Sequence, residues 1–253
     1  MSAPGQELGT SPEADVPLRV GSSGLAHRSD ATTAKSSLAL SWSGGKDSAL
    51  ALLELRRKLG CDPCALVTTV TDTYNRISMH GVRRELLALQ AQALGLPLVE
   101  VLIPPSCSNE IYEARMREVL ASKRLGSVAE VAFGDLFLED VRAYREERLA
   151  AAGKRGLFPL WARDTRELAR HFIEVGFQAV IVCVDPRALD SAFAGRRYDE
   201  RLLAELPPDV DPCGENGEFH TFVFDGPIFR RPIACTLGEI IERDGFVFAD
   251  IVA

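Results

Sequence analysis

The segment Ser43–Ser48, which reads Ser-Gly-Gly-Lys-Asp-Ser, has the residue types and spacing best suited to chemistry on a phosphate. It lies between the apolar run Leu38–Trp42 and the apolar, helix-forming stretch Ala49–Leu55. Two adjacent glycines allow positive φ and a close approach of the backbone to a ligand. A helix that starts here, near the aspartate, points unpaired amides and its positive dipole end at the same place. Lys46 adds a mobile positive charge and the two serines add hydroxyl donors. The segment therefore predicts a phosphate-binding loop.

A tight turn, in which Ser43 is an ordinary helix cap, is the alternative interpretation of the same residues. Glycine is roughly 0.5–1 kcal/mol less favourable than alanine inside regular structure, so two in succession need a compensating gain. Hydrogen bonds from amides to phosphate oxygens are worth about 1.5–3 kcal/mol each, so a bound phosphate would supply this compensating free energy. The segment lacks the four residues that separate the glycines of the Gly-x-x-x-x-Gly-Lys-Ser/Thr loop. A different nucleotide loop is expected.

A second group of candidate residues follows the strand pattern Glu130–Phe133. Gly134 and Asp135 come directly after it, so that the Asp135 carboxylate is expected at the sheet edge where ligands gather. The alternative is that Asp135 caps the next helix. Arg145 and Glu146, later in that helix, are expected on a solvated, salt-bridged face.

A third group lies in Gly214–Thr221, which reads Gly-Glu-Asn-Gly-Glu-Phe-His-Thr. Glu218 and His220 are two residues apart and would share one side of an extended strand. A carboxylate beside an imidazole can orient it, raise its pKa and accept a proton from an attacking amine. Glu215 is a second candidate carboxylate in the same loop. A glycine-bearing hairpin turn with charged surface residues is the alternative.

Alternating apolar runs and helical patterns between about Ser37 and Asp185 predict an α/β fold with a parallel, doubly wound sheet. The expected strands are Leu38–Trp42, Ala65–Thr71, Leu98–Ile103, Glu130–Phe133 and Ala179–Val184. The expected helices are Ser48–Leu59, Val82–Leu94, Asn109–Leu125, Leu138–Ala152 and Thr165–Val175. Ligands of such sheets bind beyond the carboxyl ends of the strands, and the glycine loop is at one of them.

Three parts are expected along the chain. Residues 1–36 are rich in Ser, Ala, Gly, Pro and Thr and are expected to form a flexible extension. Residues 37–187 form the nucleotide-binding domain. Residues 188–253 form a smaller α+β region, with a helix in Arg196–Leu203 and strands at Phe219–Phe224 and Phe246–Ile251.

Composition limits the classes of partner. The net charge is -7, with 29 basic and 36 acidic residues, which disfavours binding to nucleic acid. No apolar stretch approaches the ~20 residues needed to span a bilayer, so a soluble, cytoplasmic protein is expected, with no membrane partner. Cys61 and Cys64 are close in sequence but lack a second pair of metal ligands, which favours two unrelated cysteines over a metal knuckle or a sulfur carrier.

Taken with their order, these motifs resemble two nested groups of enzymes. Ser43–Ser48 is similar to the signature of the PP-loop ATP pyrophosphatase superfamily. The pieces that resemble the diphthine–ammonia ligase (diphthamide synthase) family within it are Ser43–Ser48, Phe133–Asp135, Pro159-Leu160-Trp161 with Asp164, Gly195-Arg196 and Gly214–Thr221. The later loop has Asn216 and Phe219 where the family often has glycine and tyrosine.

The resemblance implies an adenine nucleotide alpha hydrolase (HUP-like) fold and ATP cleaved between its α and β phosphates, with Mg²⁺. It implies that the nucleotide is bound by Ser41, Ser43, Gly44, Gly45, Lys46, Asp47, Ser48, Val67, Thr68 and Thr69. Asp47 would hold Mg²⁺ indirectly. The family activity adds Lys46, Asp135, Glu215, Glu218 and His220 as candidate catalytic residues.

The resulting hypothesis is an ATP-dependent amidoligase, which adenylates a carboxylate and then amidates it with ammonia or an amine. The acceptor, small or protein-borne, and a homo-oligomer are left open. Two alternatives remain: a sulfur transferase that uses Cys61 or Cys64, and a nucleotide-binding sensor without turnover.

Overall fold

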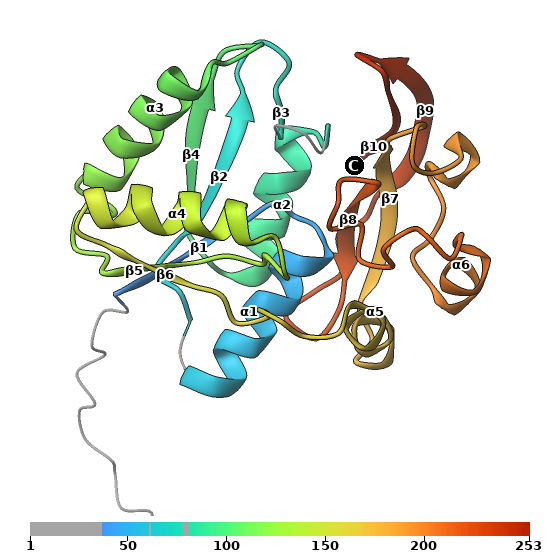
Figure 1. Cartoon of the computed structure of the whole chain (residues 1–253), viewed down its shortest axis with the longest axis horizontal. Helices are drawn as coiled ribbons and strands as arrows, with labels where there is room; N and C mark the ends of the chain where they lie inside the picture. The colour runs from blue at the N-terminus through green and yellow to red at the C-terminus, as the bar shows by residue number, and fades with distance from the viewer. Residues whose placement is uncertain (1–36, 61, 78–80) are drawn as a thin grey trace, which may run out of the picture. The chain divides into compact units, whose positions relative to one another are not determined.

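The computed structural model describes residues 37–60, 62–77 and 81–253. The expected extension 1–36 lies outside these ranges, as does Cys61. Figure 1 shows two sheets with helices around them. Within the described ranges, no helix is both long and apolar enough to cross a bilayer.

The first sheet has parallel strands in the spatial order β4–β2–β1–β5–β6, of which β6 was not predicted from the sequence. The strands are β1 (Leu38–Ser41), β2 (Leu66–Thr71), β4 (Leu98–Ile103), β5 (Glu130–Ala132) and β6 (Arg155–Leu157), and a short β3 (Arg76–Ile77) lies antiparallel to the end of β2. All the parallel strands end at one edge, so the loops that follow β1, β2, β4 and β5 gather there.

Each face of this sheet is covered by two helices. Leu38 and Leu40 of β1 lie in one apolar cluster and Ala39 lies in another, because successive side chains point to opposite faces. The helices α3 (Asn109–Ala121) and α4 (Glu139–Ala151) cover the Ala39 face, whereas α1 (Lys46–Leu59) and α2 (Arg84–Leu94) cover the other. These bounds agree with the predicted helices to within a few residues.

Helix α1 is buried on more than one side. Every residue from Ser48 to Leu55 is buried, because α1 packs on the parallel sheet and also contacts strand β8 of the second sheet. Apart from the buried Glu54, its polar residues lie near its two ends, and Arg56, Arg57 and Lys58 form its last turn. The start of α1 therefore lies between the two sheets.

The second sheet is antiparallel, in the order β8–β7–β10–β9. Its elements are β7 (Gln178–Val184), β8 (Phe219–Asp225), β9 (Thr236–Arg243) and β10 (Phe246–Val252), and α5 (Thr165–Glu174), a 3₁₀ turn at Ser191–Phe193 and α6 (Glu200–Glu205) complete this part.

The prediction that Ala179–Val184 belongs to the parallel sheet was wrong. This strand, β7, is the neighbour of β8 and β10 in the antiparallel sheet. It is central there and buried on both faces, so its unbroken apolar run looks like that of a strand in a parallel sheet. The predicted domain boundary at residue 187 stays a prediction. Strand β7 precedes this boundary in the sequence, but it pairs with β8 and β10, which follow the boundary.

One ion-pair cluster joins the two sheets. Asp250 of β10 accepts hydrogen bonds from Arg76 of β3 at 2.9 Å and from Arg83 at 2.6 Å. These bonds, led by the one from Arg83, lower the pKa of Asp250 to about 2. The folded state therefore favours the carboxylate over the protonated acid.

Asp250→Asn is expected to lower the free energy of unfolding by about 1–2 kcal/mol at pH 7. Because the folded pKa is depressed, this stabilisation is fully present above about pH 4 and is lost as the pH falls towards 2. Urea unfolding of both proteins from pH 7 downwards measures it. Glu239→Gln, at an exposed carboxylate on β9, is the control and should leave stability unchanged. Equal stability of wild type and Asp250→Asn at pH 7 would contradict the role given to the cluster.

Candidate functional site

The glycine loop after β1 is held in place by a buried side chain of α2. Gly44 has φ +78°, in the left-handed region, and an added Cβ would lie 2.7 Å from Gln90 Oε1. Gln90 is fully buried and its Nε2 donates to the Gly44 carbonyl at 3.0 Å and to the Val223 carbonyl of β8 at 2.7 Å. Only glycine fits this conformation and this contact. The predicted loop geometry is present at Gly44.

The turn from the loop into α1 is tight. The Ser43 hydroxyl accepts from the Gly45 amide at 3.3 Å and lies 3.2 Å from the Ser48 hydroxyl, which donates to the Gly45 carbonyl at 2.9 Å. Helix α1 starts at Lys46, and its N-cap Gly45 makes no side-chain capping bond. The interpretation of Ser43 as a helix cap is therefore wrong. The positive end of α1 carries no carboxylate or hydroxyl at its N-cap position.

Lys46 is not the mobile cation that the sequence suggested. It is 2% exposed, and its Nζ pairs with the Asp47 carboxylate at 2.8 Å and donates to the Cys213 carbonyl. The rings of Tyr198 and Phe219 lie 6.0 and 5.7 Å from it. Burial opposes the charge, but the Asp47 carboxylate outweighs it and raises the pKa of Lys46, so the ammonium stays protonated.

The three motif segments meet at the start of α1. An added Cβ on Gly134 would lie 2.8 Å from the Asp47 carbonyl carbon, so the backbone of Phe133–Asp135 packs directly on the first turn of α1. The Thr221 hydroxyl accepts from the Lys46 amide at 3.0 Å. Glu215 Oε1 accepts from the Leu136 amide at 2.7 Å. Segments that are far apart in the sequence thus form one site.

Glu218 lies inside its own loop. It is 5% exposed, and its Oε1 accepts from the Asp211 amide and from Asn216 Nδ2, both at 3.0 Å. Its Oε2 is buried without a hydrogen-bond partner. Since these contacts hold the Gly214–Thr221 loop, Glu218 supports the loop, and its catalytic role stays a prediction.

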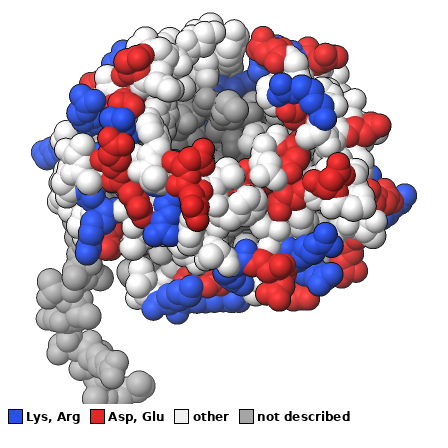
Figure 2. All heavy atoms as spheres, viewed as in Figure 1, with Lys and Arg blue, Asp and Glu red and all other residues white. Residues whose placement is uncertain are grey.

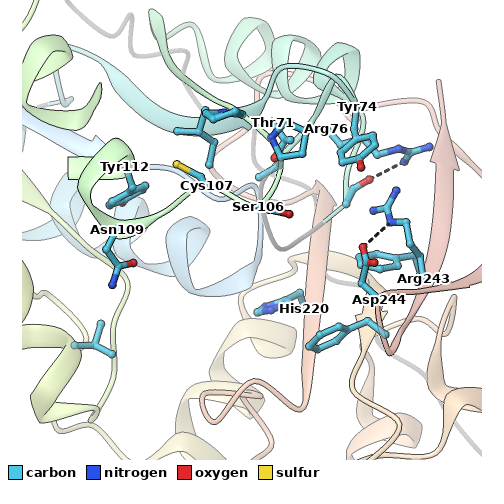
Figure 3. A pocket seen from close by; sticks show the side chains of 18 of the residues that line it. Thr71, Tyr74, Arg76, Ser106, Cys107, Asn109, Tyr112, His220, Arg243 and Asp244 are labelled. Atoms are coloured by element: carbon cyan, nitrogen blue, oxygen red, sulfur yellow. Dashed lines mark hydrogen bonds and ion pairs between the residues drawn. The ribbon is translucent and has the colours of Figure 1, made fainter. Parts of the chain in front are cut away.

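A large cavity of about 760 Å³ opens beside this site (Figure 3). His220 of β8 faces it, opposite Thr71 at the end of β2 and the Ser106–Asn109 segment after β4. The β9–β10 turn closes another side with Arg243 and Asp244. The cavity therefore lies at the carboxyl edge of the parallel sheet, where the fold predicts a ligand.

A second cavity of about 100 Å³ lies under α3 and α4. Two of the residues assigned to the nucleotide, Ser41 and Val67, line it together with Phe133 and Met116. Thr68 is buried instead and its hydroxyl donates to the Trp42 carbonyl, which fixes the start of the loop. Thr69 follows in the same strand. The wall is mostly apolar, as for a flat aromatic base.

Two titrating groups of the third segment have shifted pKa values. Burial raises the pKa of Glu215 to about 7. Burial, with the nearby Lys46 charge, lowers the pKa of His220 to about 4, so its imidazole is neutral at pH 7. Glu215 therefore titrates near neutral pH and can accept a proton there, whereas the neutral His220 is only a weak base.

A metal site built from side chains alone does not fit this region. Within the described residues, no group of three or more His, Cys, Asp and Glu side chains is arranged to hold a metal ion. The Asp47 carboxylate is already paired with Lys46. An indirect role for Asp47, through water and with phosphates as the main ligands, is the arrangement that this geometry allows.

Comparison with known families covers most of the chain. Residues 36–154 match the diphthamide synthase N-terminal domain, and residues 164–249 match the diphthamide synthase C-terminal domain. The chain belongs to the diphthamide synthase family. The break between the two matches falls before α5, the helix that precedes β7 of the second sheet.

Curated relatives of this diphthamide synthase family member carry the name diphthine–ammonia ligase. One from Schizosaccharomyces pombe is 25% identical over 220 residues, which are 79% of this chain and 36% of that protein. The human relative is 26% identical over 193 residues, 70% of each chain. One from Danio rerio is 26% identical over 234 residues, 83% of this chain and 90% of the relative. The chain thus spans about a third of the length of the yeast relative.

One solved structure is also similar, a predicted subunit of a tRNA methyltransferase from Methanocaldococcus jannaschii. It is 16% identical, with a TM-score of 0.38, and the match covers 78% of this chain and 98% of that one. A likeness of this extent supports no statement about function.

Sequence reasoning missed two residues that shape the candidate site of this diphthamide synthase family member. Gln90 sits in the apolar helix stretch Leu86–Leu94, and a lone amide on such a face was the available signal. Thr221 is the last residue of the Gly214–Thr221 motif, but its hydrogen bond with the Lys46 amide joins positions that are 175 residues apart in the sequence. Only the folded chain shows that contact.

Proposed function

We propose that this protein is an ATP-dependent amidoligase that activates a carboxylate as an acyl-adenylate and converts it to an amide with ammonia. The meeting of the glycine loop, Phe133–Asp135 and Gly214–Thr221 at the start of α1 carries this proposal. The names of the curated relatives make a protein-borne diphthine the first acceptor to consider. A small-molecule carboxylate is the other.

The two cavities suggest where the reactants bind. Adenine would occupy the small apolar cavity beside Ser41 and Val67, with its phosphates directed to the amides at the start of α1. The acceptor would occupy the large cavity, which is open enough for a group on a protein. The alternating charges of the face seen in Figure 2 include no broad basic area, as expected for an acceptor that is not a nucleic acid.

The chemistry takes two steps. The acceptor carboxylate oxygen attacks the α-phosphorus, the bond to the bridging oxygen breaks, and pyrophosphate leaves with the electron pair. Ammonia then attacks the acyl carbon, AMP leaves, and one proton is released. Loop amides and Lys46 would stabilise charge in the first step. Glu215 and His220 would accept the proton in the second.

Mg²⁺ would neutralise phosphate charge when bound, with Asp47 in contact through water. Sulfur transfer has less support: Cys64, one of the two cysteines that it would use, lies just before β2, at the amino edge of the parallel sheet, whereas the glycine loop lies at the carboxyl edge. A cytoplasmic location and a homo-oligomer stay predictions.

Incubation of the protein with ATP labelled at the α-phosphate, Mg²⁺, ¹⁵N-ammonium and fractionated cell extract tests the proposal. We expect AMP and pyrophosphate in equal amounts, only with an extract fraction, and ¹⁵N in an amide of that fraction. ADP as product would contradict the proposal. Nucleotide binding with no AMP from any fraction would indicate a sensor.

A further inference from the structure

The small and large cavities meet at three residues. Tyr112 of α3 and Tyr144 and Arg145 of α4 line both. If the nucleotide occupies one cavity and the acceptor the other, the attacking oxygen and the α-phosphorus must meet at this junction. The residues that line both cavities are therefore the ones placed beside the reacting atoms.

Among these three residues, Arg145 carries the charge. Burial raises the pKa of both Tyr112 and Tyr144, so their hydroxyls stay neutral, and the Tyr144 hydroxyl donates to Glu113 at 3.1 Å. Arg145 was expected on a solvated, salt-bridged helix face; it is salt-bridged, but its side chain is only 29% exposed and lines the cavities. Its guanidinium lies 4.4 Å from the centre of the Phe133 ring and pairs with Asp135. Both of these contact residues, Phe133 and Asp135, belong to the segment that packs on the first turn of α1.

The pair between Arg145 and Asp135 leaves hydrogen-bonding capacity unused. One half of the guanidinium fork donates to Asp135 Oδ1 at 3.1 Å. On the other half, Nε and Oδ2 form an ion pair at 2.6 Å whose alignment is poor for a hydrogen bond, and neither atom has a hydrogen-bond partner among the described residues. Because the fork is not fully matched to Asp135, part of its donor capacity remains for a phosphate oxygen at the junction of the cavities.

We propose that Arg145 binds the α-phosphate of ATP, and then the phosphate of the acyl-adenylate, where the nucleotide cavity opens into the acceptor cavity. This inference rests on the proposed function. A planar guanidinium offers two parallel donors to phosphate oxygens, and stacking on Phe133 fixes its plane. Asp135 is then the positioning residue that aims the fork. Arg145 forms and breaks no covalent bond.

Arg142, one turn earlier on α4, provides a matched control. It also pairs with a carboxylate, Glu146 at 2.9 Å, and also stacks on aromatic rings, those of Phe158 and Trp161 at 4.9 and 4.6 Å. It lines neither cavity. Arg142→Ala removes the same kinds of contact from the same helix without touching the junction.

Binding of three ligands to the full chain separates the phosphate contact from the rest of the site. The ligands are adenosine, AMP and α,β-methylene-ATP, which is not cleaved between its α and β phosphates, each titrated by calorimetry with Mg²⁺ present. Arg145→Ala is expected to weaken AMP and α,β-methylene-ATP at least about tenfold, equivalent to about 1.4 kcal/mol, and adenosine less than about twofold. Arg142→Ala should match wild type for all three.

A second variant covers the case in which Arg145→Ala leaves the Asp135 carboxylate uncompensated and the protein unfolds. The double variant Arg145→Ala, Asp135→Asn removes both charges and should show the same selective loss. Equal weakening of adenosine and AMP, or no weakening of AMP in the folded double variant, overturns the inference. Failure of wild type to bind α,β-methylene-ATP overturns the proposed function instead.

Discussion

Lys46→Met is expected to slow the formation of AMP and pyrophosphate by about 10²–10³-fold, the range seen when one preorganised charge donor is removed from an active site. Lys46 joins the glycine loop to the Gly214–Thr221 segment: it starts α1, its amide donates to Thr221, and its ammonium contacts Asp47 and the Cys213 carbonyl. The methionine keeps an unbranched apolar stem and removes the charge. Release of AMP from labelled ATP, with the active extract fraction, measures the loss.

Loss of stability has to be separated from this loss of activity, because a buried ammonium is replaced. Lys154 offers the comparison: it is 7% exposed, and its Nζ donates to the Leu125 and Val128 carbonyls at 3.0 and 2.6 Å. It lies before β6, at the amino edge of the parallel sheet, away from the glycine loop. Lys154→Met should lower the thermal midpoint while the folded protein keeps its rate. AMP formation by Lys46→Met within threefold of wild type would exclude the loop lysine from phosphate chemistry.

The parallel sheet could be predicted because its signals are local. The apolar run of β1, the two glycines and the helical pattern of α1 follow each other within about twenty residues, and the observed bounds differ by few positions. Strand β7 shows the limit of such signals. Its sequence specifies an extended, buried strand but not its neighbours, which come from residues 219–225 and 246–252. Pairing is a property of the whole chain.

The site shows the same division between local and long-range information. Gly44 and Gly134 were identified in the sequence, and each is glycine because another segment comes close, Gln90 in one case and the α1 backbone in the other. The partners could not be named beforehand. The mobility expected of Lys46 and the solvated position expected of Arg145 were wrong for the same reason: each side chain contacts groups that come from other segments of the chain.

Glu215→Gln is expected to slow the amidation step about 10²-fold and to flatten its pH dependence. Burial raises the pKa of Glu215 to about 7, so the fraction present as carboxylate, the form that can accept a proton, grows as the pH rises from 6 to 8. Wild-type amidation should therefore increase over this range and level off above it. Gln keeps the oxygen that accepts from the Leu136 amide, so the loop stays attached. Hydroxylamine as nitrogen donor gives a hydroxamate that is read directly. Because hydroxylamine is partly protonated at the lower end of this range, rates are compared at equal concentrations of its unprotonated form.

Stability supplies an independent check on the same residue. Because the folded pKa of Glu215 is raised, the folded state binds more protons than the unfolded chain between about pH 5 and 7, and wild type loses stability as the pH rises through this range. Glu215→Gln should lack that slope. Glu146→Gln, at an exposed carboxylate of α4 that pairs with Arg142, should keep both the slope and the amidation profile. Glu215→Gln could lose the stability slope and still keep the wild-type pH profile of hydroxamate formation. In that case Glu215 titrates as described but does not act as the base. His220, whose pKa is about 4, would then be the remaining proton acceptor on that loop.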